Sequence, residues 1–116
     1  MEKNILVDLS KEFAVKIIKL CDAIKVRGRE NALINQLLRS GTSIGANIHE
    51  ANYAASKADF INKFQIALKE CYETGYWLEV FQAAEIITER EYQEYFSSCS
   101  KLRKLLIASI NTAKNN

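Results

Sequence analysis

Apolar side chains recur at intervals of three and four residues along nearly the whole chain, and this spacing constrains the fold more than any other feature. It places those side chains on one face of an α-helix. Four segments carry it, over about residues 4–25, 31–54, 57–84 and 89–114. Proline is absent and only four glycines occur in 116 residues, so the residues that usually mark hairpins and long loops are scarce. The sequence therefore predicts four helices.

Local signals mark the ends of these helices. Gly28 follows the first segment, as expected of a helix C-terminus. Residues 56–59, Ser-Lys-Ala-Asp, resemble a capping box, and residues 88–91, Thr-Glu-Arg-Glu, form a complete one. Short connections between long helices favour antiparallel neighbours. We therefore expect an all-α fold, an up-down-up-down four-helix bundle in a single domain over residues 1–116.

Charge and hydropathy constrain where the protein is expected in the cell more than they constrain its function. Sixteen basic and fourteen acidic residues leave a net charge of +2, which permits contact with nucleic acid but does not argue for it. No apolar run approaches the roughly 20 residues that span a bilayer, and the N-terminal segment carries acidic residues where a signal peptide is apolar. We expect a cytoplasmic protein with no membrane association.

The three cysteines, Cys21, Cys71 and Cys99, each fall on an apolar stripe. They are odd in number, far apart, and free of the spacing that binds metals. Reduced residues of the core are the favoured interpretation, over a disulfide, a metal ligand or a nucleophile. No metal or cofactor is expected.

The stretch RSGTSIGANIHE, residues 39–50, admits either a phosphate-binding loop or a closely packed helix. A P-loop needs four residues between its glycines, a lysine after the second, and a preceding strand. Gly41 and Gly45 are separated by three residues, no lysine follows Gly45, and helical spacing continues on both sides. The pattern favours a helix with one thin surface against which a neighbouring helix packs closely.

A polar strip runs along the same segment, rotated away from its apolar stripe. It contains Gln36, Arg39, Ser43, Asn47 and Glu50. One interpretation is a solvated face. The other is a hydrogen-bonded network at a helix or subunit boundary, in which Arg39 pairs with Glu50 and Asn47 fixes the register.

The third segment is apolar on a second side. Ile66, Trp77 and Val80 project together, with Glu73 among them, on the side predicted to lie opposite the core stripe. A helix that is apolar on two sides must be covered on both. This predicts self-association, with Trp77 as the main contact residue, unless the three are scattered surface residues.

Two motifs make the chain similar to a known family. SGTSIGANIHEA and FQIALKECYETGYWLEV resemble the four-helix-bundle proteins encoded within intervening sequences of bacterial 23S rRNA genes, the S23 family. The residues that carry the resemblance are Arg39, Ser43, Ile44, Asn47, Ile48, Glu50, Ala67, Leu68 and Glu73. The chain departs from the family pattern at Glu70 and Ala51, where glycine is common, and at Cys71, where serine is common.

The resemblance implies an assembly and a class of partner. Proteins similar to this one form ring-like homopentamers, and a related branch serves as the accessory protein of reverse transcriptases in diversity-generating retroelements. The implied partners are therefore further copies of the chain, RNA or DNA, and a reverse transcriptase. The polar set Arg39, Ser43, Asn47, Glu50 and Glu73 would lie at a contact surface.

Three functional hypotheses remain open. In the first, a non-catalytic oligomer binds nucleic acid through Arg27, Arg29, Lys101 and Lys104, and repetition in a ring strengthens a weak basic surface. In the second, Glu50 and Glu73 act as an acid/base pair, with or without His49; the lack of any nucleophile–base or metal-ligand pattern disfavours an enzyme. In the third, the bundle is an adaptor for a protein partner.

Overall fold

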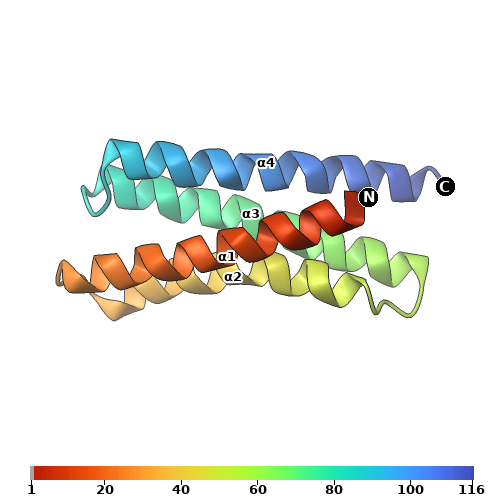
Figure 1. Ribbon diagram of the computed structural model, residues 1–116, viewed down its shortest axis with the longest axis horizontal. Helices are drawn as coiled ribbons and strands as arrows, with labels where there is room; N and C mark the ends of the chain where they lie inside the picture. The colour runs from red at the N-terminus through yellow and green to blue at the C-terminus, as the bar shows by residue number, and fades with distance from the viewer. Residues whose placement is uncertain (1) are drawn as a thin grey trace.

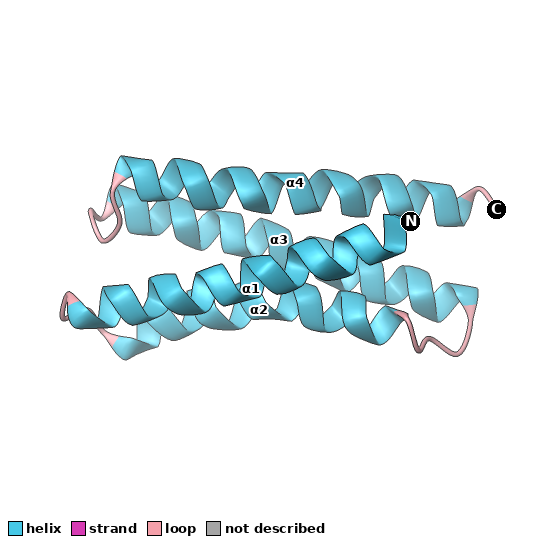
Figure 2. Ribbon diagram, viewed as in Figure 1, coloured by secondary structure: helices cyan, strands magenta, loops and turns pink. Residues whose placement is uncertain are grey.

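Four long helices make up the computed structural model of the chain, which describes residues 2–116 and the side chains from residue 5 onward (Figures 1 and 2). They are α1 (Glu2–Val26), α2 (Asn31–Ala51), α3 (Lys57–Ala83) and α4 (Glu89–Lys114). Successive helices run antiparallel along a body of 48 × 21 × 19 Å, and the two ends of the chain lie on the same side (Figure 1). The predicted all-α four-helix bundle is confirmed.

The boundaries agree with the sequence except at the end of α2. The apolar spacing predicts helix to residue 54, but α2 ends at Ala51. The amides of Asn52, Tyr53 and Ala54 each bond to the carbonyl three residues earlier, at 3.2, 3.0 and 3.2 Å. This tighter turn ends the α-helix but keeps side chains at nearly the same spacing. The apolar pattern therefore predicts a helix three residues longer than α2.

Side chains cap α3 and α4 where the capping motifs predict. The Ser56 hydroxyl accepts from the amide of Asp59, and Asp59 in turn accepts from the amide of Ala55 at 3.2 Å. At α4, Thr88 and Glu91 form a complete capping box. These bonds satisfy backbone donors that the first turn of a helix leaves unpaired.

The four apolar stripes meet in one core. Its largest fully buried side chains come from all four helices: Leu6, Phe13, Ile17 and Ile24; Ile34, Leu37, Ile44 and Ile48; Leu78 and Phe81; Leu102 and Leu106. Cys21, Cys71 and Cys99 are buried and free, as their places on the stripes suggest.

The glycines of α2 bring α1 within close contact. A Cβ atom at Gly41 would lie 2.9 Å from Cγ2 of Ile17, and one at Gly45 would lie 3.3 Å from the backbone oxygen of Ser10. Both glycines lie inside a continuous helix, so the phosphate-loop interpretation is wrong and the close-packing interpretation is confirmed.

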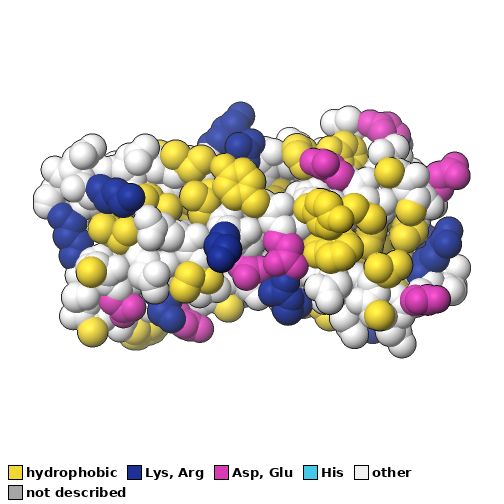
Figure 3. Space-filling view, turned by 180° about the vertical axis from the view of Figure 1, so that it is seen from behind, with side chains coloured by type: hydrophobic (Ala, Val, Ile, Leu, Met, Phe, Trp, Pro, Cys, Tyr) yellow, Lys and Arg dark blue, Asp and Glu magenta, His cyan; other side chains and the backbone are white. Residues whose placement is uncertain are grey.

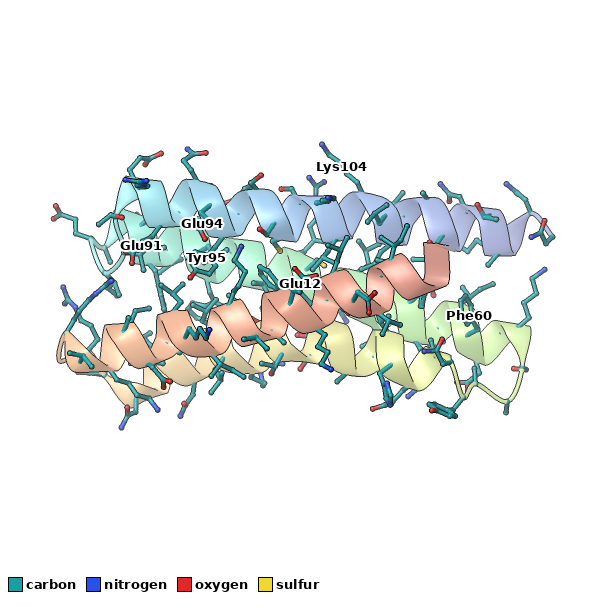
Figure 4. The ribbon with its side chains drawn as sticks, viewed as in Figure 1. Glu12, Phe60, Glu91, Glu94, Tyr95 and Lys104 are labelled. Atoms are coloured by element: carbon teal, nitrogen blue, oxygen red, sulfur yellow. The ribbon has the colours of Figure 1, made fainter. Side chains whose placement is uncertain are left out.

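The α1–α4 pair shares the least contact of the four neighbouring pairs. Long polar side chains bridge it instead. Lys16 lies 3.6 Å from the Glu94 carboxylate and 5.7 Å from the Tyr95 ring centroid. Figure 4 shows Glu91, Glu94 and Tyr95 along the first half of α4, above α1.

Candidate functional site

Arg39 of α2 forms the centre of a charged cluster with α3. Its guanidinium donates to Glu70 at 3.3 Å and to Glu73, and Glu73 also accepts from the indole nitrogen of Trp77 at 3.1 Å. The expected Arg39–Glu50 pair is therefore wrong. Eleven residues separate the two along α2, roughly 16 Å of helix, whereas the packing of α3 places Glu70 and Glu73 beside Arg39. We call Arg39, Glu70, Glu73 and Trp77 the Arg39 cluster.

Glu50 has a different partner, Lys63 of α3, at 3.0 Å. Ten residues separate Lys63 from Glu73 on the same helix, which corresponds to about 15 Å. The two carboxylates considered as an acid/base pair are thus held by different cations at different levels of the bundle. His49 is exposed and stacks beside Tyr53, with ring centroids 5.5 Å apart.

Two other members of the polar strip, Ser43 and Asn47, bond within α2. The Ser43 hydroxyl donates to the Arg39 carbonyl at 2.6 Å, and the Asn47 amide donates to the Ser43 carbonyl at 2.9 Å. Both side chains are half-buried, and neither reaches another helix through these bonds. The strip therefore bridges to α3 only at its two charged residues, Arg39 and Glu50.

The Arg39 cluster is accessible to water. Side-chain exposure is 50% for Arg39, 19% for Glu70 and 35% for Glu73. The hydrogen bond from Arg39, followed by that from Trp77, holds the pKa of the Glu73 carboxyl below its usual range. Glu73 in turn raises the pKa of Arg39. The cluster is an ion-pair network with exposed charge that a partner can reach.

Ile66, Trp77 and Val80 do not lie opposite the core, and that prediction is wrong. All three are half-buried, and Trp77 and Val80 pack against the core, with the Trp77 ring 6.3 Å from that of Phe81. They share the flank of α3 that carries Glu73 and faces α2. A helix between two neighbours is covered on both flanks, so its apolar sector is wider than one stripe.

Apolar side chains nevertheless reach the surface of the α2–α3 side. Seen from that side, they gather in patches on both sides of a central group of acidic and basic side chains (Figure 3). On the opposite flank of α3, toward α4, Tyr72 and Tyr76 are 55% and 57% exposed. These two tyrosines are more exposed than Trp77, which is half-buried against the core.

Every charged residue of α4 after Glu94 is basic. No acidic residue follows Glu94, while Lys101, Arg103 and Lys104 follow within ten positions. Lys101 and Lys104 are exposed, and Figure 4 shows Lys104 extending away from the bundle. Within the part of the chain that the structure describes, no carboxylate lies within 4.0 Å of any of these three. This basic segment of α4 can contact phosphate groups.

The two arginines predicted to join it differ from each other. Arg27 donates to the Ile86 carbonyl at 2.9 Å and to both carboxylate oxygens of Glu91, at 3.2 and 2.6 Å. It therefore ties the end of α1 to the α3–α4 turn, and phosphate would have to displace Glu91. Arg29 is exposed in the α1–α2 turn.

Comparison with known proteins places the chain in a family. The family model described as 23S rRNA-intervening sequence protein matches residues 2–108. The chain belongs to this family. No protein of curated function matches it.

A solved structure extends this result to the whole fold of the intervening-sequence protein. The chain is similar to a protein of unknown function from the S23 ribosomal protein family of Bacteroides thetaiotaomicron VPI-5482, with 48% sequence identity and a TM-score of 0.93. The similarity covers 96% of this chain and 99% of that one. Both therefore share the four-helix bundle along essentially their full lengths.

The helices of this intervening-sequence protein carry neither a membrane span nor a metal-binding cluster among the residues described. Among the described residues, no helix is long and apolar enough to cross a membrane. Over the same residues, no three side chains of metal-binding type come together.

One surface of this family member is not predicted by its sequence pattern. A groove opens between the outer faces of α3 and α4, with Tyr72 and Tyr76 on one side and Phe96 and Arg103 on the other. The sequence contains a hint of the groove, because two tyrosines lie four residues apart beside Gly75. Whether they line a groove depends on which part of α4 lies opposite them, and the sequence pattern does not give that.

Proposed function

We propose that this intervening-sequence protein is a non-catalytic oligomer that binds nucleic acid through the basic segment of α4. The observation that supports it best is a run of three cations, two of them exposed, that form no ion pair among the described side chains. Lys101, Arg103 and Lys104 form one basic segment and have no ion-pair partner among the described side chains. Phosphate contacts of this kind give affinity without sequence readout.

Oligomerisation is the second part of the proposal. The family resemblance implies a homopentamer, and the apolar patches on the α2–α3 side supply surface for contact between copies (Figure 3). A ring repeats each basic segment, and several weak contacts on one strand combine into an effective affinity well above that of one bundle. We also propose that the protein acts in the cytoplasm, where its three free cysteines stay reduced.

Binding is tested by fluorescence anisotropy with labelled single-stranded RNA, single-stranded DNA and duplex DNA over a range of salt concentrations. We expect affinity to fall steeply with salt, and Lys101→Gln/Lys104→Gln to lower the slope by about 0.7 for each single-strand phosphate contact removed. The matched control is Lys19→Gln/Lys25→Gln, which removes the same charge from exposed positions of α1. A wild-type oligomer that binds none of the three probes at 50 mM salt would refute the proposal.

The solution mass tests the assembly. Light scattering at tens of micromolar should give about five times the 13.2 kDa of one chain. The proposed contact residues are Ile66, Trp77 and Val80, which are half-buried on the flank of α3 that faces α2 and keep part of their surface exposed. A monomer at that concentration would remove the oligomer from the proposal.

A protein partner is the second candidate, including a reverse transcriptase as the resemblance implies. The Arg39 cluster favours it, because it combines partly exposed ion pairs with the half-buried ring of Trp77, a mixture that suits a protein interface. In that case Arg39→Ala would abolish capture of the purified partner while Lys101→Gln/Lys104→Gln left it intact. Weaker nucleic-acid binding by Lys101→Gln/Lys104→Gln, with binding by Arg39→Ala unchanged, would support the first candidate.

A further inference from the structure

The groove between α3 and α4 is an open, aromatic-walled cavity of about 430 Å³. Tyr72, Tyr76 and Glu79 form its α3 side, and Phe96, Ser100 and Arg103 form its α4 side. We call it the tyrosine groove. It is separate from the Arg39 cluster, which lies on the opposite flank of α3, against α2.

Gly75 allows the Phe96 ring to form the bottom of the groove. The glycine has no side chain, so the Phe96 ring approaches the α3 backbone, and a Cβ at Gly75 would lie 3.3 Å from its Cε1 atom. Phe96 is therefore drawn inward while Tyr72 and Tyr76 remain outside, more than half exposed. The result is a recess with exposed aromatic rings at its rim.

The charges are arranged along the groove. Arg103 lies near Tyr72, with its guanidinium carbon 5.8 Å from the ring centroid. Glu79 lies toward the other end, and the seven residues from Tyr72 to Glu79 correspond to about 10 Å of helix. Arg103 has no carboxylate within 4.0 Å among the side chains described. The cationic end is therefore free to bind an anion.

We propose that the tyrosine groove holds one unpaired nucleotide of a bound single strand. The base stacks on the tyrosine rings, Arg103 binds its phosphate, and Glu79 accepts a hydrogen bond from an amino group on the base. Base stacking on aromatic side chains is tolerant of sequence and adds to backbone contacts. A carboxylate accepts from the amino group of cytosine, whereas uracil has no such group.

The surroundings favour a nucleic acid as the occupant. Arg103 directly precedes the exposed Lys104 in the basic segment of α4, so a strand held by Lys104 lies within reach of the cationic end of the groove. The roughly 10 Å of α3 between Tyr72, which lies beside Arg103, and Glu79 is comparable to the length of one nucleotide from phosphate to base edge. This inference rests on the proposed function, and it adds a site for the base to the phosphate contacts already described.

The test compares tyrosine variants at fixed salt, with labelled oligo(dC), oligo(dT) and duplex DNA as probes. Tyr76→Ala should weaken binding of oligo(dC) roughly tenfold, the effect of one stacked base. Tyr76→Phe should bind as the wild type does, because the ring remains. Tyr53→Ala is the matched control, since Tyr53 is 78% exposed and lies outside the groove.

Charge variants separate the two ends of the groove. Arg103→Gln should weaken binding and lower the salt slope, whereas Tyr76→Ala should leave the slope unchanged because it removes no phosphate contact. Glu79→Gln should reduce the preference for oligo(dC) over oligo(dT). Duplex binding should not respond to Tyr76→Ala, because paired bases are not free to stack.

The outcomes distinguish this inference from the function on which it rests. If the wild type binds single strands but Tyr72→Ala and Tyr76→Ala bind equally well, the groove is not a base site and the phosphate contacts stand. If the wild type binds no probe, the proposed function fails with it. A changed solution mass for Tyr76→Ala would overturn the inference in favour of an interface between copies.

Discussion

The two interfaces that α2 makes, with α1 and with α3, are built from different materials. Against α1, α2 presents Gly41 and Gly45, and the helices approach until a single added carbon would collide with Ile17. Against α3, it presents Arg39 and Glu50, whose long side chains cross the surface to reach acidic and basic partners. The α1–α2 interface depends on close packing, whereas the α2–α3 interface has solvent-exposed ion pairs along its outer edge.

The difference teaches where stability and binding can be found. Close packing of apolar groups tolerates little change, because a well-filled interior has no room for added atoms. Exposed ion pairs contribute little to stability, since water screens them and their side chains lose freedom on pairing. The α1–α2 interface therefore maintains the bundle, while the outer edge of the α2–α3 interface is free to exchange partners.

The largest expected effect comes from filling the α1–α2 interface. Gly41→Leu should lower the free energy of unfolding by about 3 kcal/mol, because Ile17 is fully buried and cannot move aside. Urea unfolding followed by circular dichroism measures it. Ala46→Leu on the exposed face of α2 is the control and should cost little. Equal losses for the two variants would show that the interface is not close-packed.

Alkaline pH offers a second test of the same interface. The Cys21 thiol lies there, 3.9 Å from the Ile34 carbonyl, and burial raises its pKa from 9.0 to about 11. The folded state holds this proton more tightly, so the contribution is present below pH 9 and is lost as pH rises toward 11. Between pH 8 and 10.5 the wild type should lose about 2 kcal/mol more than Cys21→Ala.

Urea unfolding at several pH values, with a reductant present, measures this difference. Lysines and tyrosines titrate in both proteins, so the comparison isolates the thiol. Parallel curves for the wild type and Cys21→Ala would mean that Cys21 is open to solvent, and that α1 and α2 separate more readily than the glycine contacts suggest.

The helices and the glycine contact could be predicted because both depend on local spacing. Residues three and four apart share a face whatever surrounds them, and Gly41 and Gly45 interrupt neither the stripe nor the helix. The end of α2 was missed because the tighter turn at residues 52–54 preserves that spacing. Spacing alone does not distinguish an α-helical bond from one that spans three residues.

The partners across helices could not be predicted in the same way. Arg39 and Glu50 share a face of α2, so the sequence suggested that they pair, but their true partners lie on α3. The tyrosine groove was missed for the same reason. Its walls come from α3 and α4, and the level at which Gly75 meets Phe96 depends on how the whole core packs. The spacing of apolar residues along the sequence does not show which residues of two neighbouring helices lie at the same level.

The smallest expected effect lies at the α2–α3 interface, in the Arg39–Glu73 pair. A double-mutant cycle with Arg39→Gln and Glu73→Gln should give a coupling of about 0.5–1 kcal/mol at pH 7, because both side chains are partly exposed and screened. The pKa of Glu73 is lowered in the folded state, so its contribution is present above pH 4 to 5 and is lost as pH falls through that lowered value.

Urea unfolding at pH 7 and at pH 3, each at low and high salt, tests both statements. Salt should weaken the coupling at pH 7, and acid should diminish it further. A coupling above about 2 kcal/mol that resists salt would place this pair among desolvated ion pairs. The α2–α3 interface would then maintain the bundle as the α1–α2 interface does, and the Arg39 cluster would lose its suitability as a surface that exchanges partners.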